Sequence, residues 1–546
     1  MSFLSIFEIG RTAVLATQTQ LNVVGNNLAN AATPGYNRQE VILDVVTPVT
    51  QGNQKIVVGQ GVSVAAIRRQ YDALLQNQIN LAQQDYGQSS TLNQYLSSID
   101  QIFNEAQNLG LATPLTDFFN AWQELANNPQ GLTERSLVLQ KTDSLINSAQ
   151  QMEKGVTDTL TQINTGITSD VTKINDLATQ IAKLNDQITQ VEAGSGMGTS
   201  NSLRDKRDQV LKDLNYLIEA GSWEDSSSGA LTVTVGQRNL VSGSSTKTLS
   251  AIASQNGAYT LKLDGMDITS QVTKGEIGGL SAASQDIRAN LQDFRKLIAS
   301  LANQVNLQHI QGFDLDALGG TSFFNPIQLT VVKTSASGNL TSSITDYSQL
   351  TMDEYAVNFV DDGSGGFNYQ ITNADTGALK TSGAYVAAGT TVNLEGIRFV
   401  LSGTVTAQDS FSVSPLTTAI QNFGKVVTDS RKIAASSSAT SVPGNNVNAL
   451  AVADIINNQI SSLDSGTVVD FYQSLVGQIG SQTKTAIDSE VFAKNFLGQL
   501  TNKRDSISGV NMDEEAANLI RFQRAFQAAA RLISTADELF QTLLNL

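Results

Sequence analysis

The C-terminal stretch, residues 511–546, reads NMDEEAANLIRFQRAFQAAARLISTADELFQTLLNL. Its apolar residues recur at alternating spacings of three and four, and no proline or glycine interrupts them. The recurring positions are Leu519, Phe522, Phe526, Ala529, Ile533, Ala536, Phe540 and Leu543. This spacing predicts one long helix with an apolar seam along one side. Three acidic residues, 513–515, stand at its start, where the helix dipole favours anions.

The N-terminal stretch has the same alternation, which predicts a second long helix. Its seam positions are Phe3, Phe7, Gly10, Val14, Thr17, Leu21, Val24 and Leu28. Either helix alone could pack on a globular core of its own. Two seams at opposite ends of the chain favour instead mutual pairing as a coiled coil, or self-association. We therefore expect an assembly interface at Phe7, Val14, Leu21 and Leu28, and at the eight C-terminal seam positions above.

Composition excludes several classes of function. The chain has 546 residues, of which 34 are basic and 50 acidic, and its net charge of −16 argues against a nucleic-acid partner. Cysteine is absent, which removes disulfides, thiolate catalysis and thiolate metal sites. His309 is the single histidine, so imidazole metal clusters and most catalytic triads are also excluded. A structural or binding protein is the remaining expectation.

The sequence also predicts neither membrane insertion nor a cleaved secretory signal. No run of about 18 apolar residues occurs. The N-terminus has no positively charged leading region, and Glu8 and Arg11 interrupt its short apolar run.

Between the terminal helices, longer helical patterns predict a bundle. Apolar residues from Leu145 to Val191 indicate one helix of roughly 60 residues. A second helix carries Leu203–Leu217, a third runs from about Asp286 to Ile310, and a fourth set spans about Asn446 to Ser506. Helices of this length are typical of an elongated bundle.

Two stretches inside this bundle carry strand signals. Residues 222–275 contain Leu231–Val235 and the turn pair Asp264–Gly265, and residues 313–415 contain several more alternating segments. The predicted fold is therefore mainly α, with paired terminal helices, an elongated helical bundle and inserted antiparallel β domains. We expect these segments: 1–65, N-terminal helix and extended linker; 66–221, 281–312 and 416–507, helical bundle; 222–280, small β domain; 313–415, outer β domain; 508–546, C-terminal helix.

No segment predicts catalysis or a cofactor. The run Asp361–Gly366 has glycines at positions 363 and 365, where a calcium loop needs oxygen ligands. No Gly-x-Ser-x-Gly nucleophile motif occurs, and no carboxylate pair stands out as an acid/base couple. A lone histidine at the end of a helix is typical of a capping or packing group. We expect no enzyme activity, no cofactor and no metal.

Several motifs, in the same order along the chain, resemble those of a known family. They are Asn26–Asn30, Thr33–Arg38, Gly59–Asp72, Asn201–Gln209, Asn306–Leu315 and Ser508–Leu519. The first two and the last are similar to the terminal signatures of bacterial flagellar axial proteins, that is, rod, hook and hook-associated proteins. The others are similar to the hook-associated proteins of the hook–filament junction.

This resemblance implies a structural role in filament assembly and motility. It implies type III export of the unfolded chain from the cytoplasm to the extracellular flagellum, and self-association into a ring at the hook–filament junction. It implies as partners the hook subunits, a second hook-associated junction protein, and an export chaperone at the C-terminal region. The paired terminal helices would then line the central channel.

Three other interpretations stay open at this point. The chain could be another axial protein such as the hook subunit, which should lack the 201–209 and 306–315 motifs. It could be a secreted adhesin or tip protein in which 313–415 binds a receptor. It could also carry an enzyme in that β region, for which convergent carboxylates in a pocket would be the sign.

Overall fold

The computed structural model describes residues 3–47, 49–50, 57–105, 110–195, 198–253, 257–335 and 337–545. The chain divides into two compact units. We call them the terminal unit (Met1–Leu92, Thr165–Ser281 and Ile487–Leu546) and the central unit (Asn93–Asn164 and Ala282–Ala486). Each boundary between them falls within one of four long helices: α2 (Ala73–Ile102), α4 (Leu132–Ser195), α6 (Gly275–Ile310) and α8 (Val468–Ser508).

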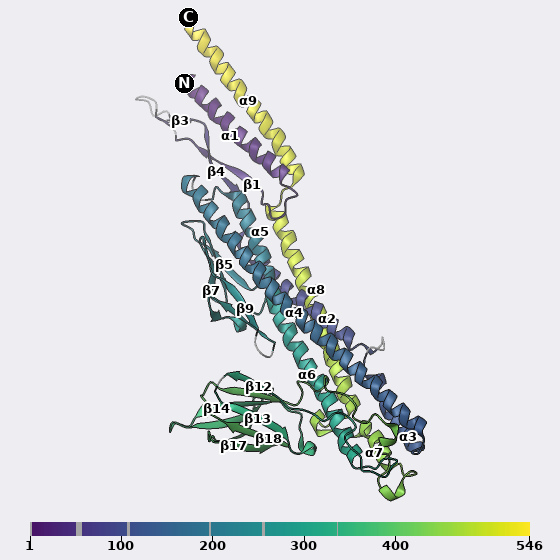
Figure 1. Cartoon of the computed structure of the whole chain (residues 1–546). Helices are drawn as coiled ribbons and strands as arrows, with labels where there is room; N and C mark the ends of the chain where they lie inside the picture. Colours follow the sequence, from purple (N-terminus) through teal and green to yellow (C-terminus); the bar gives the residue numbers. More distant parts are fainter. Residues whose placement is uncertain are drawn as a thin grey trace. The chain divides into compact units, whose positions relative to one another are not determined.

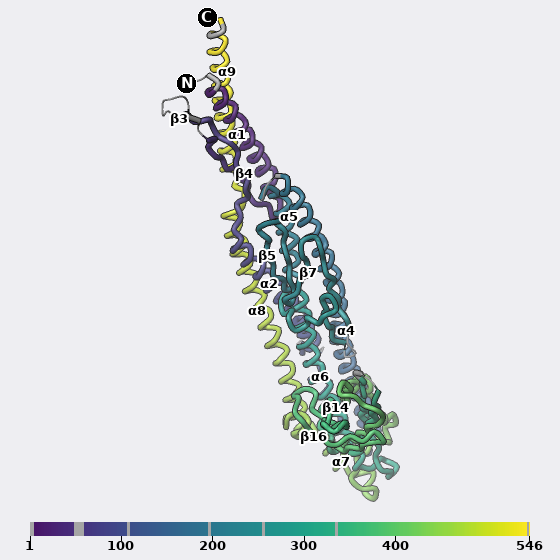
Figure 2. The backbone as a smooth tube through the Cα atoms, turned by 90° about the vertical axis from the view of Figure 1, so that its left-hand side faces the viewer, coloured from purple at the N-terminus to yellow at the C-terminus, as the bar shows by residue number. Residues whose placement is uncertain are grey.

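The terminal unit contains the two chain ends as a pair of helices. Helices α1 (Phe3–Ala29) and α9 (Met512–Leu544) lie side by side (Figures 1 and 2). Asn511 caps α9, because its side-chain oxygen accepts the amide N–H groups of Asp513 at 3.0 Å and Glu514 at 3.3 Å. Each end of the chain therefore forms the long helix that its apolar spacing predicts.

An antiparallel ribbon follows α1 and packs against it. Its long strands are β1 (Gln39–Val45) and β4 (Val62–Arg69), and its tip pairs β2 (Val49–Thr50) with β3 (Val57–Val58). This ribbon confirms the extended structure expected after the first helix, apart from residues 48 and 51–56, which lie outside the described ranges. Helix α5 (Asn201–Leu217) completes the helical part of this unit.

The first β insertion consists of two small sheets held to α4. One has the order β5-β6-β7-β8 and the other β11-β10-β9. The strands are β5 (Ala220–Glu224), β6 (Leu231–Val235), β7 (Arg238–Ser242), β8 (Ser245–Thr246), β9 (Leu249–Ala253), β10 (Tyr259–Leu263) and β11 (Met266–Asp267). Asp264 and Gly265 both have positive φ between β10 and β11, so the predicted hairpin turn is confirmed.

Two asparagines of α4 attach these sheets. The Asn185 amide donates to the Leu231 carbonyl at 2.8 Å and accepts the Leu231 N–H at 3.0 Å. The Asn175 amide makes the same two bonds to Leu249, at 2.9 and 3.0 Å. Each asparagine side chain thus replaces a peptide group of a neighbouring strand.

In the central unit, α3 (Ala112–Asn127) packs against α7 (Val447–Ala453) and contributes three rings to an aromatic core. Its rings, with centroids 4.7–6.4 Å apart, are those of Phe118, Phe119, Trp122, Phe323, Phe324 and Phe423. His309 is fully buried beside Trp122; its Nδ1 lies 2.6 Å from the Thr321 carbonyl, and its Nε2 accepts the Ala434 N–H at 2.9 Å. Burial lowers the pKa of His309 to about 4, although the Thr321 carbonyl opposes that shift. The histidine is a packing residue.

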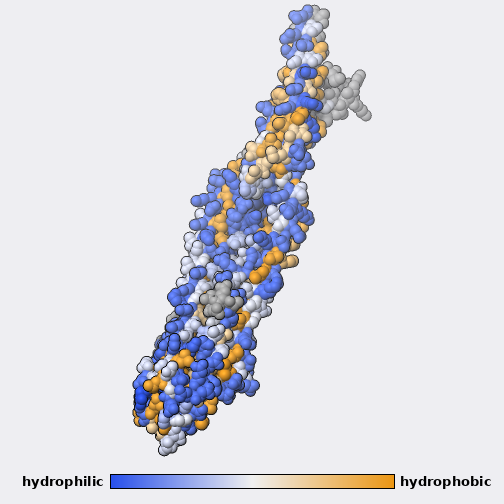
Figure 3. Space-filling view, turned by 90° about the vertical axis from the view of Figure 1, so that its right-hand side faces the viewer, coloured by the Kyte–Doolittle hydropathy of each residue, from blue (hydrophilic) through white to orange (hydrophobic). Residues whose placement is uncertain are grey.

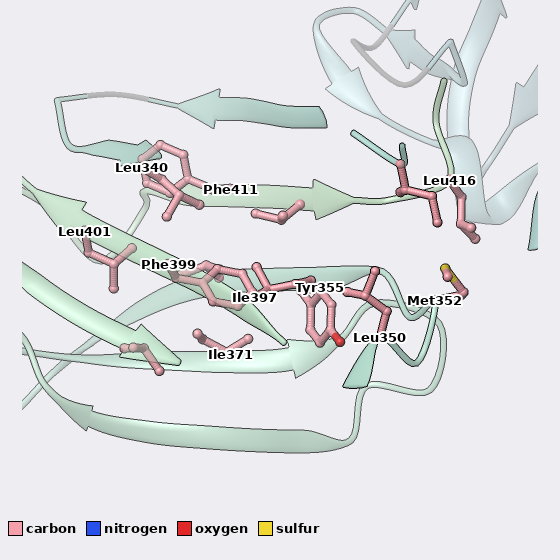
Figure 4. Packing of buried hydrophobic residues seen from close by; sticks show 14 of the residues in the cluster. Leu340, Leu350, Met352, Tyr355, Ile371, Ile397, Phe399, Leu401, Phe411 and Leu416 are labelled. Atoms are coloured by element: carbon pink, nitrogen blue, oxygen red, sulfur yellow. The ribbon is translucent and has the colours of Figure 1, made fainter. Parts of the chain in front are cut away.

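The second insertion packs two antiparallel sheets face to face. Their orders are β12-β19-β14-β15-β16 and β13-β18-β17. The strands are β12 (Thr330–Ser335), β13 (Asn339–Ile344), β14 (Tyr355–Asp361), β15 (Phe367–Asn373), β16 (Leu379–Ala384), β17 (Thr390–Leu394), β18 (Ile397–Ser402) and β19 (Ser410–Ser414). Alternate residues of β14 are buried, and apolar side chains of both sheets meet in one core (Figure 4).

The fold class predicted from the sequence, mainly α with inserted antiparallel β domains, is confirmed. The predicted start of the third helix is wrong, because α6 begins at Gly275 and not near Asp286. The fourth helical set is α7 and α8, separated by short 3₁₀ turns and by Asp464 and Ser465, which have positive φ. The segment boundaries given above stay a prediction. None of the helices in the described ranges has the length and apolar character needed to cross a membrane.

Candidate assembly surface

The pairing of α1 with α9 depends on a close approach at one glycine. A Cβ atom placed on Gly10 would lie 2.8 Å from Cγ1 of Ile533 and 3.6 Å from the carbonyl oxygen of Ala529. Seventeen residues further along α1, Asn27 contacts Glu515, so the two helices run antiparallel. The small seam residue at position 10 therefore admits Ile533 where a larger side chain would separate the helices.

A buried carboxylate joins the other end of the pair to the ribbon. Glu515 is buried; it accepts the Asn27 side-chain amide at 3.1 Å and lies 2.8 Å from Nε of Arg38. Asn27 also bonds the backbone of Gln39 in both directions, donating at 2.9 Å and accepting at 3.0 Å. We call Asn27, Arg38 and Glu515 the latch, because they connect α1, β1 and α9.

The ribbon is fixed in turn to α5 by a second set of charges. Asn37 donates to Asp205 at 2.6 Å, and Arg69 lies 2.9 Å from Asp205 and 2.6 Å from Asp208. Burial, together with the negative charges of Asp205 and Glu515, raises the pKa of Tyr36 to about 12, so Tyr36 stays a neutral donor. The base of the helix pair is thereby held at two points, by the latch and by α5.

The predicted interface residues differ in how much of their surface the chain itself covers. Ala529 and Ala536 are buried, whereas Phe7 is 42% and Phe540 is 53% exposed. The half-buried positions are Val14, Leu21, Leu28, Leu519, Phe522, Phe526 and Ile533. The side chain of Leu543 lies outside the described residues. Intrachain pairing thus covers one side of the seam and leaves large apolar side chains accessible.

Sequence analysis did not identify the latch. Its residues nevertheless lie in the motifs that carried the family resemblance, since Asn27 and Arg38 belong to the N-terminal signature and Glu515 to the C-terminal one. Likewise Arg69 and Asp205 come from the two motifs at 59–72 and 201–209. Polar and charged residues in motifs far apart in the sequence could have predicted that these segments contact one another.

The described residues do not form a metal-binding cluster. No group of three or more His, Asp or Glu side chains in the described ranges could hold a metal ion. Asp362, in the glycine-rich turn considered for calcium, accepts the N–H groups of Ser364 and Gly366 at 2.8 and 2.9 Å. This surface consists of accessible apolar side chains on the α1–α9 pair, next to the polar contacts of the latch and of α5.

Comparison with known proteins gives four family matches, which include both terminal segments and two segments between them. Residues 96–324 match the flagellar hook-associated protein FlgK helical domain, and residues 330–415 match the flagellar hook-associated protein 1, D2-like domain. Residues 7–37 match the flagella basal body rod protein family, and residues 503–546 match the flagellar basal body rod FlgEFG protein C-terminal family.

Full-length relatives agree with these matches. Flagellar hook-associated protein 1 of Escherichia coli is 30% identical over 99% of this chain and 100% of its own length. The protein of the same name from Bacillus subtilis is 26% identical over 98% of this chain and 97% of its own length. The structure of the flagellar hook junction protein FlgK from Burkholderia pseudomallei shares the fold, with a TM-score of 0.68 at 20% identity over 79% of this chain and 100% of that one.

Proposed function

The chain belongs to the flagellar hook-associated protein 1 (FlgK) family and is a structural protein of the hook–filament junction, and from this premise we propose that its copies self-associate into a ring through the α1–α9 pair. The observation that carries the proposal is the apolar surface that this pair leaves accessible. Phe7 and Phe540 are exposed, and Phe522 and Phe526 are half-buried. Large apolar patches on a soluble chain mark surfaces that a partner covers.

The two terminal segments are similar to those of flagellar rod proteins, which supports a ring stacked on other proteins along the flagellar axis. The matches at 7–37 and 503–546 are to rod-protein families, so both terminal segments are of the type that rod and hook proteins share. We propose the hook subunits as the partner on one side of the ring and a second hook-associated junction protein on the other.

The accessible seam also has consequences for how the chain is kept from aggregating and exported before it assembles. We propose that the chain crosses the flagellar export apparatus unfolded, and that a cytoplasmic chaperone covers the C-terminal region until then. The row of apolar residues on α9 would otherwise be free to aggregate. The absence of cysteine fits a chain that passes from a reducing to an oxidising compartment.

A structural role needs no chemistry, and we propose none: no catalysis, cofactor, nucleic-acid partner or membrane insertion. The mechanism is mechanical, since the latch and the α5 contacts hold the helix pair at its base while the pair offers its apolar surface to neighbouring copies.

Labelling of isolated flagella tests this function. A tagged copy, produced in cells that lack the native protein, should restore filaments and give one labelled band between hook and filament. A variant lacking residues 3–29 should be found in the medium without restoring filaments. Label along the whole filament, or restored filaments with the shortened variant, would contradict the proposal.

A further inference from the structure

One side of α8 carries exposed apolar side chains within the terminal unit. Phe492 is 71%, Phe496 43% and Ile507 41% exposed, and a fourth residue in the same row, Leu500, is half-buried. The rings of Phe492 and Phe496 lie parallel, with their centroids 6.1 Å apart. At 3.6 residues per turn, these four residues fall within a sector of roughly 80° and extend over roughly 22 Å of the helix. We call them the α8 stripe.

The stripe faces away from the rest of the terminal unit. Thr501 and Arg504 of α8 line a small cavity together with Lys212 of α5, so they mark the side of α8 that packs on the unit. The stripe is centred roughly 100° around the helix from these two residues. Figure 3 views the side on which α8 lies, where hydrophobic residues interrupt a largely hydrophilic surface. A row of exposed aromatic and aliphatic side chains marks a surface that a partner covers.

A groove of similar length lies between α4 and α5 in the same unit. It consists of two hollows, of about 600 and about 460 Å³, which join at Gln180. Along α4 the groove extends over residues 173–187, which is roughly 21 Å at 1.5 Å per residue. The half-buried apolar side chains that line it are those of Leu177, Leu184, Val210 and Tyr216. We call it the α4–α5 groove, with an upper hollow beside the loop 33–36 and a lower hollow beside Tyr216.

The stripe and the groove begin at the same loop of the chain. Pro34 and Tyr36 line the upper hollow. Two residues after Tyr36, the backbone N–H of Arg38 donates to the carbonyl of Ser508 at 2.8 Å, directly after the last stripe residue, Ile507. From this loop both features extend along the terminal unit, α8 on one side of it and α4 on the opposite side (Figure 2). Each copy therefore presents an apolar row and a groove at the same level on opposite sides.

We propose that the α8 stripe of one copy docks into the α4–α5 groove of the adjacent copy at the same axial level. Two different surfaces on opposite sides of each copy give a head-to-tail contact, which generates a ring where the rotation closes. Because the stripe and the groove begin at the same loop, this contact needs no axial shift from one copy to the next, as a closed ring requires. The inference rests on the proposed ring and adds a second contact to that of the α1–α9 pair.

The levels of the side chains match those of the hollows. Helices α8 and α5 run away from the loop 37–38 in opposite sequence directions, and Thr501 is level with Lys212, since both line one cavity. Five residues beyond Thr501, Phe496 is then level with the C-terminal end of α5, at the lower hollow. Six residues in the other direction, Ile507 is level with the second turn of α5, at the upper hollow. An adjacent copy at the same level therefore offers an apolar hollow to each of these side chains.

Thiol cross-linking tests the contact directly, because the chain has no native cysteine. Lys503 is exposed in the row of the stripe and is level with Val210, which lines the same hollow as the exposed Gln180. The full-length variant Gln180→Cys/Lys503→Cys should give a ladder of cross-linked copies on oxidised flagella. Either single cysteine variant can give dimers at most. Gln180→Cys/Asn502→Cys places the second thiol one position along, at an exposed residue off the stripe, and should give at least tenfold less ladder.

Substitution within the stripe tests the cause. In the background of Gln180→Cys/Lys503→Cys, Phe496→Asp should lower the ladder at least tenfold, because a carboxylate would have to enter an apolar hollow. Thermal melting by circular dichroism should change little, since the Phe496 ring is exposed in the single copy. Val491→Asp is the matched control: Val491 is 53% exposed but lies roughly 140° around the helix from the stripe. This control should change the ladder less than about twofold.

The outcomes separate this inference from the proposed function. Attached filaments and a junction label without a 180–503 ladder beyond dimers would overturn the α8 contact and leave the ring through α1–α9 standing. An equal ladder from the 180–502 pair, a full ladder with Phe496→Asp, or a collapsed melt of Phe496→Asp would also overturn it. Absence of the tagged parent chain from the hook–filament junction would overturn the proposed function and this contact with it.

Discussion

Asn27 of α1 donates its side-chain amide to the buried Glu515 carboxylate of α9 at 3.1 Å, which joins the two ends of the chain 488 residues apart. Because Glu515 also pairs with Arg38, Glu515→Gln removes a buried negative charge from its contact with a partly buried guanidinium. Hydrogen bonds to charged groups contribute about 1.5–3 kcal/mol, so we expect amide exchange in α1 to accelerate by about tenfold or more. Glu514→Gln, at an exposed residue 3.3 Å from Arg38, should be nearly silent. Equal protection of α1 in both variants would show that the latch does not hold the pair.

Phe526 lies in the middle of the α9 seam and is half-buried. Phe526→Asp places a carboxylate there, and loss of a large side chain from a buried site costs about 3–5 kcal/mol. In a ring this defect recurs in every copy, so we expect cells without attached filaments although the monomer melts almost normally. Gln527→Asp, exposed and off the seam, is the control. Filament attachment and thermal melting by circular dichroism measure the two effects, and normal filaments with Phe526→Asp would remove the seam from the interface.

His309 makes the stability of the central unit depend on pH. Its folded pKa, about 4, lies below the ordinary value of about 6.5, so between these values the unfolded chain binds the extra proton. The free energy of unfolding should therefore fall as the pH drops from about 6.5 to about 4, by on the order of 3 kcal/mol, and be fully present above that range.

Urea unfolding followed by Trp122 fluorescence measures this dependence, since Trp122 contacts His309 and Trp223→Phe removes the other tryptophan. His309→Gln should be less stable at pH 7 and should lose this part of the slope. An unchanged slope in the variant would assign the pH dependence to other groups.

The outer β insertion should be removable, because its two ends are neighbours. Thr330 of β12 and Ser414 of β19 are paired in the antiparallel register. Replacing residues 331–413 by a short Gly-Ser linker therefore bridges about 5 Å. We expect the helical signal and the near-ultraviolet dichroism of the aromatic core to persist in this variant. A collapse of both would show that the insertion is required for the central unit to fold.

The glycines at the start of α6 explain why its beginning could not be predicted. Gly275, Gly278 and Gly279 have low helix propensity, so the sequence places the helix start after them. In the structure a Cβ on Gly279 would lie 2.6 Å from the Gln88 carbonyl, which means that α2 and α6 touch there through their backbones. Tertiary contact overrides propensity at these positions, and only the fold reveals the contact.

The long helices and the seam positions, in contrast, were predictable because their spacing is a local property of the chain. The latch was not, since Asn27, Arg38 and Glu515 satisfy one another only after segments from both ends of the chain meet. The sequence shows each of these polar residues, but it does not show which residue each one bonds in the folded chain.

Asn175 and Asn185 impose a fixed length on the part of α4 between them. Ten residues fall about 80° short of three full helical turns, so the two side chains point in different directions and each bonds its own sheet of the β insertion. Insertion or deletion of one residue would rotate one asparagine by about 100° and leave either Leu231 or Leu249 without its two bonds. In related chains this ten-residue interval should therefore accept substitutions but neither insertions nor deletions.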